Sequence, residues 1–438
     1  MKHVKRTVCG LLCVILLLMT ACGPEYRVKP KVKDGEMIEM ARSACEDLLA
    51  HWWVGDEKTG HFLPTRLGSE VPEDEMHIWE TAQAIFALDS AYAMTGDESY
   101  HNRIVAEWQY LHNDTIYASY KCLTEVGSVY RAWQDDCGWH ALMYLTFYRH
   151  TGDEVALEAA GDVIRNSYIF YRDGNLSRGL FYRNDYEEDR TKNLHVVSLM
   201  LAALEYLKYR EDEALLKDTM TLYQWVEETL LRDGECLCIL QNGAVKTVCS
   251  DDMLYWFMYY QGKKGEVPES ILIGPEGAYN PNMLEEGYGA TFLGGDMAMA
   301  VLHKRMFELT GEERYYTRAV ETLRAINDNP YLIVNDVYND SGDGWTNAAF
   351  MRFFVTEILT LPECQEKDIR ILNATARSIM NNARTPDGYY SACWSGPAED
   401  DADTVWGKMG WSHDKKTTCA TSVHMVIAAG LAESMGLK

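Results

Sequence analysis

The sequence predicts an all-α protein folded as an (α/α)6 barrel, a toroid of six helical hairpins with a small β-hairpin insertion. One observation behind this prediction is that helical spacing of apolar residues dominates from about residue 35 to the end. The other is a recurring boundary: Thr-Gly-Asp at 95–97 returns at 151–153, and Thr-Gly-Glu stands at 310–312. Each boundary joins a glycine helix stop to an acidic helix start. The first two lie 56 residues apart, which matches one helical hairpin and its loop.

Five such hairpins, together with the first and last helices, supply the twelve helices of six inner and six outer positions. An open solenoid of tetratricopeptide type has a shorter period of about 34 residues and does not match. The expected helices span about 38–52, 76–94, 98–111, 136–149, 154–171, 193–209, 213–231, 294–309, 313–327, 345–359, 367–383 and 417–435.

The stretch 232–290 interrupts the helical pattern. Residues 236–240 and 244–248 flank an Asn-Gly turn and predict a β-hairpin, because Asn-Gly is favoured in tight hairpin turns. The aromatic segment 253–261 is expected to form a helix, and an additional loop follows at 274–289.

The N-terminus has the composition of an export signal. Lys2, Lys5 and Arg6 precede an apolar stretch at 11–19 that is short for a membrane span. The run Leu-Met-Thr-Ala-Cys at 18–22 resembles the bacterial lipobox, in which the cysteine is lipidated.

We therefore expect a lipoprotein signal peptide at 1–21, a tether at 22–34 lipidated at Cys22, and a single barrel domain at 35–438. The protein would be lipid-anchored to a bacterial membrane and face the periplasm or the cell surface. A soluble secreted protein with a free Cys22 is the alternative.

Charge and cysteine usage narrow the possible partners. The net charge of −25 becomes −28 once the three basic residues of 1–21 are removed. Such a surface repels phosphate backbones, so no nucleic acid partner is expected, whereas a neutral polymer is not repelled. The nine cysteines beyond the signal are scattered without a Cys-x-x-Cys pair, so no metal site is expected. Nothing in the sequence indicates a pairing face, and we expect a monomer.

Two pairs of adjacent aspartates are candidates for carboxylate chemistry. Asp135-Asp136 stand just before a predicted helix, and Asp251-Asp252 precede the aromatic segment. At a helix start the first carboxylate is still outside the helix, so that the two neighbours can converge on one bond. A retaining glycosidase needs carboxyl groups about 5–5.5 Å apart, which adjacent residues can provide. Aspartate is also a favoured helix cap, so spacing alone leaves catalysis and capping open for both pairs.

A wider set of motifs favours the first pair. The run Trp-x-Asp-Asp-x-x-Trp at 133–139, followed by a helix and Thr-Gly-Asp, resembles the signature of glycoside hydrolase family 76. Members of this family degrade α-mannan, typically as endo-α-1,6-mannanases. Further segments that resemble the family cover nearly the whole mature chain: 77–83, 178–182, 192–193, 345–352 and 389–397.

The resemblance implies hydrolysis of α-1,6-mannosidic linkages in an α-mannan oligo- or polysaccharide, without a cofactor. It implies that Asp135 is the nucleophile and that Asp136 is the general acid and then the base. The implied substrate-binding side chains are indoles that stack on sugar rings and amides that bind hydroxyls: Trp79, Trp139, Trp394, Gln83 and Asn193. Burial in the helical core is the alternative for the indoles, and structural hydrogen bonding is the alternative for the amides.

Two departures from the family pattern leave the exact linkage and endo or exo action open. His140 stands where many members have a second tryptophan, and 293–296 read Leu-Gly-Gly-Asp in place of Tyr-Asn-Gln-Gly. The alternatives are another toroidal carbohydrate enzyme, such as an unsaturated uronyl hydrolase or a transglycosylase, and a glycan-binding lipoprotein without catalysis. The negative charge argues against an acidic uronyl substrate, and the presence of both aspartates favours an enzyme.

Overall fold

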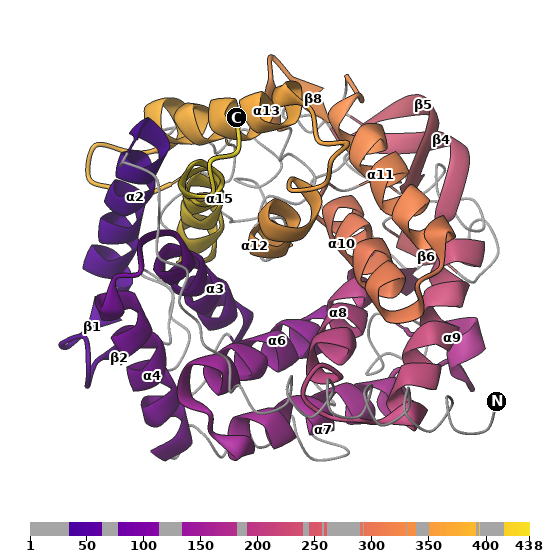
Figure 1. The fold of residues 1–438 in the computed structure, drawn as a ribbon, viewed down its shortest axis with the longest axis horizontal. Helices are drawn as coiled ribbons and strands as arrows, with labels where there is room; N and C mark the ends of the chain where they lie inside the picture. Colours follow the sequence, from indigo (N-terminus) through magenta and orange to yellow (C-terminus); the bar gives the residue numbers. More distant parts are fainter. Residues whose placement is uncertain are drawn as a thin grey trace, which may run out of the picture.

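The computed structural model describes residues 35–63, 78–113, 134–181, 191–239, 245–255, 258–260, 290–291, 293–330, 332–338, 350–390, 394 and 416–438. Within these residues the predicted helical toroid is confirmed, because the helices form two concentric rings (Figure 1). The signal peptide, the tether and Cys22 lie outside the described residues and stay predictions.

The inner ring consists of helices that are apolar on nearly all sides, as expected for helices surrounded by other helices. All ten residues of α8, for example, are buried. The inner helices are α3 (Ile78–Thr95), α6 (Gln134–Thr151), α8 (Val197–Tyr206), α10 (Leu293–Thr310), α12 (Met351–Phe353) with its π-helical continuation η7 (Phe354–Ile358), and α15 (Lys416–Ser434) (Figure 1).

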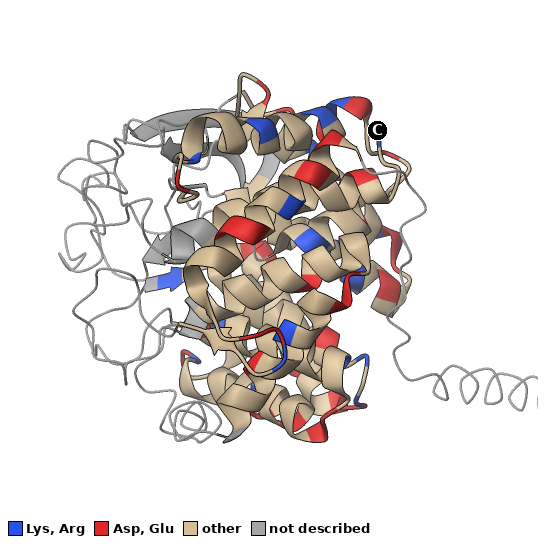
Figure 2. Cartoon of the chain, turned by 90° about the vertical axis from the view of Figure 1, so that its left-hand side faces the viewer, with Lys and Arg blue, Asp and Glu red and all other residues tan. Residues whose placement is uncertain are grey.

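The outer helices are amphipathic and bury one face against the inner ring. They are α2 (Glu36–Trp52), α4 (Glu98–Asn113), α7 (Glu154–Phe170), α9 (Glu213–Thr229), α11 (Glu313–Asn327), and α13 (Glu366–Ser378) with the π-helical segment η8 (Ile379–Ala383). Acidic residues are spread along the helices on the side that Figure 2 shows, and the sequence as a whole has 66 acidic and 41 basic residues. Of the helices that the structure describes, none combines the length and the apolar composition that crossing a membrane requires.

The predicted boundaries are helix ends in the structure. Gly96, Gly152 and Gly311 have φ angles of 67°, 69° and 70°, in the left-handed region that favours glycine at helix C-termini. The next helix starts at once: the carboxylate of Asp153 accepts a hydrogen bond from the backbone N–H of Val155 at 3.0 Å and caps α7. Local sequence therefore sets where these hairpins turn.

The toroid closes where the last helix meets the first. Helix α15 packs against both α2 and α3, as Figure 1 shows. The backbone N–H of Ile38 donates to the carboxylate of Glu433 at 3.0 Å, and Gly35 lies against the same carboxylate. The two ends of the helical ring are thus in direct contact.

The insertion between α9 and α10 contains the predicted β-hairpin. Strand β4 (Leu231–Ile239) pairs antiparallel with β5 (Val245–Tyr255), so both strands are longer than expected. The prediction of a helix at 253–261 is wrong: β5 continues to Tyr255, and β6 (Met258–Tyr260) pairs with β3 (Thr191–Asn193). Aromatic residues favour strands once a partner strand is present, and here the partner is distant in sequence.

The remaining short elements connect or flank the helices. Strand β7 (Ala290–Thr291) pairs in parallel with β4, and two small antiparallel pairs are β1 (Trp53–Val54) with β2 (His61–Phe62) and β8 (Ile333–Val334) with β9 (Val337–Tyr338). Two 3-10 turns are η2 (Leu176–Arg178) and η3 (Leu194–Val196).

A buried network of alternating charges, which we call the charge ring, joins the inner helices. Its members are Asp89, Arg149, Glu205, Arg305, Glu357 and Arg352. Arg149 of α6 lies 2.7 Å from Asp89 of α3 and 3.7 Å from Glu205 of α8. Arg305 of α10 lies 3.1 Å from Glu205 and 2.9 Å from Glu357 of η7. Arg352 of α12 pairs with Asp89 and lies on the same inner helix as Glu357.

The charge ring fixes the direction of the inner helices. Asp89, Arg149, Glu205 and Arg305 all lie in the second halves of their helices, so α3, α6, α8 and α10 run parallel. We call the end of the barrel that holds the charge ring the carboxyl end and the opposite end the amino end. Burial alone would raise the pKa of Glu205, but the guanidinium of Arg305 and its other cationic neighbours outweigh burial and lower it to about 2.

Candidate active site

The Asp135-Asp136 pair lies in the first turn of α6, at the amino end of the barrel. We expected Asp135 to precede the helix, and this is wrong because α6 begins at Gln134. Successive helical side chains diverge by about 100°, and the two aspartates differ accordingly. Asp135 is 3% exposed, whereas Asp136 is partly exposed. The pair therefore offers one buried carboxylate and one more accessible carboxylate.

Close packing between α6 and α8 positions Asp135. Gly138 follows Asp135 by three residues and lies on the same face of α6. A Cβ atom at Gly138 would stand 1.9 Å from Oγ of Ser198 in α8, so a larger residue would force the helices apart. The same Ser198 hydroxyl lies 3.4 Å from the carbonyl oxygen of Asp135.

His195 is a direct partner of Asp135. Its ring is fully buried in η3, and Nδ1 lies 3.1 Å from Oδ2 of Asp135. An ionised carboxylate only accepts hydrogen bonds, so Nδ1 carries the hydrogen in this contact. The other carboxylate oxygen, Oδ1, is also buried and has no hydrogen-bond partner among the described residues.

The segment that carries His195 is anchored by Lys192. This lysine is 1% exposed, and its Nζ donates to Asp173 at 3.0 Å and to the carbonyl of Arg178. Its ammonium group also lies over the rings of Phe181 and Trp225, 5.1 and 5.6 Å from their centroids. Since the charge of Lys192 is paired, the residue serves to hold β3 and η3 in place rather than to meet a ligand.

Buried amides with unused hydrogen-bonding atoms lie at the same end of the barrel. Nε2 of Gln134 donates to Oδ1 of Asn193 at 2.6 Å, which leaves Oε1 of Gln134 and Nδ2 of Asn193 unbonded in the described structure. Gln83 of α3 is fully buried, and neither of its amide atoms has a partner there. Each unsatisfied buried polar group costs about 1–3 kcal/mol, so such a cluster is typical of a site that a polar ligand completes.

The three tryptophans proposed for sugar stacking differ in what the structure shows. Trp79 belongs to α3, and its side chain lies outside the described part of the chain. Trp139 is 1% exposed and packs on Phe350 with ring centroids 4.7 Å apart. Trp394 is fully buried and donates to Ser422 of α15 at 3.1 Å. Trp139 and Trp394 are thus part of the barrel core in this structure, and stacking on a sugar stays a prediction.

The second aspartate pair does not start a helix, because Asp251 and Asp252 belong to strand β5. Their side chains lie outside the described residues. His140, the residue that departs from the family pattern, is buried in α6, and burial lowers its pKa well below the usual value. It is therefore a neutral imidazole at neutral pH.

Asp296 is a further buried carboxyl, in the first turn of α10. Its Oδ1 accepts from the backbone N–H of Tyr255 at 3.0 Å, and burial raises its pKa well above the usual range. His303, two turns later on α10, contacts the hydroxyl of the same Tyr255 at 2.9 Å. This face of α10 is therefore turned toward the β-hairpin, and Asp296 anchors the hairpin as a neutral acid.

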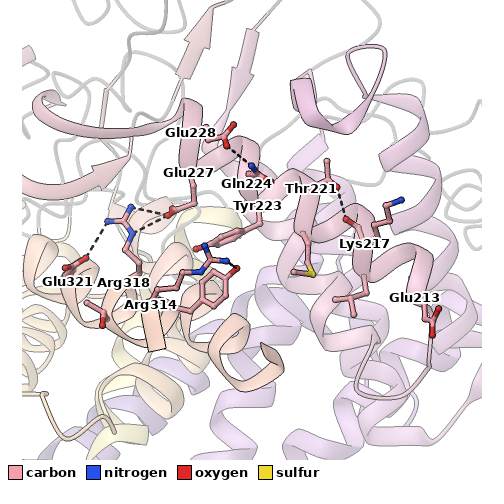
Figure 3. A pocket seen from close by; sticks show the side chains of 14 residues that line it. Glu213, Lys217, Thr221, Tyr223, Gln224, Glu227, Glu228, Arg314, Arg318 and Glu321 are labelled. Atoms are coloured by element: carbon pink, nitrogen blue, oxygen red, sulfur yellow. Dashed lines mark hydrogen bonds and ion pairs between the residues drawn. The ribbon is translucent and has the colours of Figure 1, made fainter. Parts of the chain in front are cut away.

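A groove of about 1080 Å³ between the outer helices α9 and α11 is a competing candidate (Figure 3). Its charged side chains pair with one another: Arg318 lies 3.1 Å from Glu227 and 3.5 Å from Glu321. Figure 3 shows these pairs along the groove wall. None of the residues that line the groove has a buried side-chain atom without a hydrogen-bond partner, in contrast to Gln83, Gln134 and Asn193 at the amino end.

Two residues of the candidate site were not predicted from the sequence. Gln134 directly precedes the aspartates, and His195 follows Asn193 by two positions, so both are adjacent to motifs that were recognised. Nothing in the local sequence shows that His195 meets Asp135 across 60 residues. That contact depends on the packing of α6 against η3 and α8.

No protein-family model and no curated protein sequence matches this chain. Solved structures do match. The family 76 α-1,6-mannanase of Salegentibacter sp. has a TM-score of 0.64 and 16% identity, covering 91% of this chain and 100% of that chain. An inactive variant of that enzyme, in which two neighbouring aspartates are replaced by asparagine, was solved with α-1,6-mannotriose.

Two further structures are similar over most of their length. The family 76 mannosidase of Bacteroides thetaiotaomicron has a TM-score of 0.62 and 13% identity, covering 92% of this chain and 100% of that chain. Dfg5 of Chaetomium thermophilum, solved with glucosamine, has a TM-score of 0.60 and 12% identity, covering 94% and 93%. At these identities the comparison establishes the architecture: the chain has the helical toroid fold of the family 76 glycoside hydrolase structures.

Proposed function

We propose that this protein is a retaining glycoside hydrolase of family 76 that cleaves α-1,6-mannosidic linkages in mannan-type glycans. The observation that carries the proposal is the adjacent Asp135-Asp136 pair in the first turn of an inner helix, beside buried amides with unused hydrogen-bonding atoms. The amides suit a ligand rich in hydroxyl groups, because hydroxyls both donate and accept. The shared fold with α-1,6-mannanases supports the mannan substrate.

In the proposed first step, Asp135 attacks the anomeric carbon of the bound mannoside. An electron pair of its carboxylate forms the new C–O bond while the bond to the glycosidic oxygen breaks. Asp136 donates its proton to that oxygen, so the departing sugar leaves as a neutral alcohol. The environment of Asp135 suits its role, because the hydrogen bond donated by His195 favours the ionised carboxylate. Asp136 is partly exposed and can exchange protons with water.

In the second step, Asp136 takes a proton from water as the water oxygen attacks the same carbon. The ester bond to Asp135 breaks and its electron pair returns to the carboxylate. Two displacements at one centre retain the configuration of the mannose. Gln83, Gln134 and Asn193 would bind sugar hydroxyls in both steps, and Trp79 would stack on a sugar ring.

We further propose that residues 1–21 are removed and that a lipid on Cys22 anchors a monomeric barrel to a bacterial membrane. The export-like composition of 1–19 and the lipobox-like run at 18–22 support this arrangement. Metabolic labelling with a fatty-acid probe should mark the wild type and should not mark Cys22→Ala.

The proposal is tested by digesting α-1,6-mannan with the wild type, Asp135→Asn and Asp136→Asn. We expect products from the wild type and a loss of turnover of at least about a thousandfold in each variant. A 2-fluoro mannoside should trap a covalent intermediate on Asp135, identified by peptide mass spectrometry. An inactive wild type on a panel of α-mannosides would overturn the proposed activity.

Two controls separate catalysis from folding and from the rival pair. Asp212→Asn removes an acidic N-cap of the outer helix α9, which accepts from Leu215 at 2.9 Å, and should keep its turnover. Asp251→Asn should also stay active. Loss of turnover in Asp251→Asn but not in Asp135→Asn would move the catalytic assignment to the second pair.

A further inference from the structure

We propose that His195 is a positioning residue that binds Oδ2 of Asp135 and so leaves Oδ1 as the oxygen that attacks the sugar. The inference rests on the proposed function, because it assigns a role within the same site. Nδ1 of His195 lies 3.1 Å from Oδ2, whereas Oδ1 is buried and unbonded within the described structure. The two oxygens of one carboxylate are therefore not equivalent.

His195 is held rigidly enough to fix the orientation of the carboxylate. Its ring is fully buried, and its own carbonyl accepts a hydrogen bond from Ser198 at 2.8 Å. Lys192 anchors the same segment to Asp173, and Gly138 allows α8 to approach α6. Because the imidazole of His195 is already fixed, it can orient the Asp135 carboxylate before substrate binds. Neither side chain then loses further conformational freedom on binding.

The chemistry of the contact favours the nucleophile in its reactive form. A hydrogen bond donated to a carboxylate stabilises the ionised state, which is the nucleophilic form. Oδ2 already accepts from the imidazole, so attack through Oδ1 keeps the hydrogen bond as charge leaves the carboxylate. When the ester bond breaks, its electron pair returns to Oδ1, while Oδ2 keeps the hydrogen bond from His195.

Among the residues that the structure describes, four further titratable groups lie near the contact. Asp136 is the adjacent residue on α6, and Lys192 is neutralised by Asp173. Burial raises the pKa of the Cys137 thiol to about 12, so it is neutral. Asp296 of α10, an element that packs against η3 through Gly295 and Leu194, keeps its proton. Among the described residues, the His195–Asp135 contact is therefore the one that substitution of His195 changes directly.

The activity test compares His195→Leu with His195→Asn. Nδ2 of asparagine reaches about the place of the histidine Nδ1 and keeps a donor, whereas leucine keeps bulk alone. We expect His195→Leu to lose roughly ten- to a hundredfold in kcat, with little change in KM. The acidic limb of its kcat/KM profile should move up by about one pH unit. His195→Asn should restore most of the kcat and return the acidic limb close to its wild-type position.

His303→Phe is the matched control. His303 is equally buried and contacts the hydroxyls of Tyr223 and Tyr255 at 2.8 and 2.9 Å, on the face of α10 turned to the outer layer. This variant should lower Tm and leave the pH profile of kcat/KM unshifted. Equal losses in His195→Leu and His195→Asn, with no shift of the acidic limb, would show a merely structural role and overturn the inference.

A second measurement does not depend on turnover or on the folding of His195→Leu. Protein labelled with ¹⁵N-histidine should show the His195 ring, identified by its absence in His195→Asn, as the tautomer with hydrogen on Nδ1. Asp135→Asn should change those ring-nitrogen shifts. Unchanged shifts overturn the inference, whereas changed shifts in a protein inactive on every mannoside support the contact and refute the proposed function alone.

Discussion

The two ends of the inner helices bury different kinds of polar groups. At the carboxyl end, three carboxylates and three guanidinium groups alternate around the charge ring, and each acid contacts a base. At the amino end, Gln83 has no partner in the described structure, and Gln134, Asn193 and Asp135 each keep one unbonded atom. Most of these side chains are buried at both ends.

The charge ring therefore contributes to stability, whereas the amino end is suited to binding and reaction. Paired buried charges hold neighbouring helices in a fixed arrangement, and removal of one partner is severe because the other stays buried and uncompensated. Unsatisfied buried amides lower stability and are otherwise rare. The amino end therefore resembles a ligand-binding site whose hydrogen bonds a ligand would complete. The carboxyl end resembles a structural network that holds the inner helices together.

The largest effect on stability is expected from Arg305→Met. The change removes the guanidinium that lies between Glu205 and Glu357 and leaves two acids under-compensated. The free energy of unfolding should fall by about 3–5 kcal/mol, measured by urea denaturation at neutral pH. The control Arg370→Met breaks an exposed pair with Asp336 and should cost less than about 1 kcal/mol. Equal effects from both variants would show that the charge ring stabilises the fold no more than an exposed ion pair does.

Asp296→Asn should make the stability of the protein less dependent on pH. Burial raises the pKa of Asp296, so the folded protein retains a proton that the unfolded chain releases above about pH 4. The contribution of Asp296 to stability is therefore present below that pH and lost as pH rises toward the folded pKa. Asparagine has no such dependence and keeps the acceptor for Tyr255. The advantage of Asp296→Asn should grow between pH 4 and 8 by at most about 1.4 kcal/mol per pH unit.

Thermal unfolding of both proteins across this range measures the difference. Asp296→Leu, which cannot accept from Tyr255, should be less stable than Asp296→Asn at every pH. A difference between wild type and Asp296→Asn that stays constant with pH would show that the carboxyl is ionised in the folded protein.

Gln83→Met should separate stability from function at the amino end. Methionine matches the shape of glutamine and removes two buried, unbonded polar atoms, so the free energy of unfolding should rise by about 1–2 kcal/mol. Loss of a hydrogen bond to a sugar hydroxyl should raise KM for mannan about three- to tenfold. Lower stability together with unchanged KM would place Gln83 in the structural framework.

Ser90→Ala should give the smallest effect. Ser90 of α3 contacts Nε2 of His424 in α15 at 2.7 Å beside the charge ring. Burial lowers the pKa of His424 to about 3, so the ring is neutral and loses only a neutral hydrogen bond. A decrease of about 1 kcal/mol in the free energy of unfolding is expected, with unchanged turnover on mannan. A loss as large as that of Arg305→Met would show that the charge ring depends on this hydrogen bond.

The helical architecture was predictable because its signals are local. Apolar spacing, the glycines at 96, 152 and 311, and the acidic helix starts act within a few residues, and the structure confirms each of these helix ends. The hairpin at 231–255 was likewise indicated by its turn. The prediction of a helix at 253–261 was wrong because this segment forms strands that pair with distant parts of the chain. Tyr259 of β6, for example, lies opposite Lys192 of β3.

The candidate site was predictable in its motifs and not in its contacts. Asp135, Gln83 and Asn193 were named from their sequence neighbourhoods, and the structure places all three at the amino end. The partner of Asp135 is 60 residues away, and Arg305 and Glu357 are 52 residues apart. Such pairs form because helices pack side by side, and a single sequence carries no record of which helices are neighbours.

The contact between α2 and α15 has a consequence for the connectivity of the chain. With Gly35 against Glu433, the helical ring has no intrinsic first hairpin, since every hairpin has a neighbour on either side. A circular permutant that links 438 to 35 and opens at Gly152, where an added Cβ would meet no atom within 4 Å, should reach the same toroid. The order of the hairpins along the chain would then not determine the fold, because their order around the ring would be unchanged.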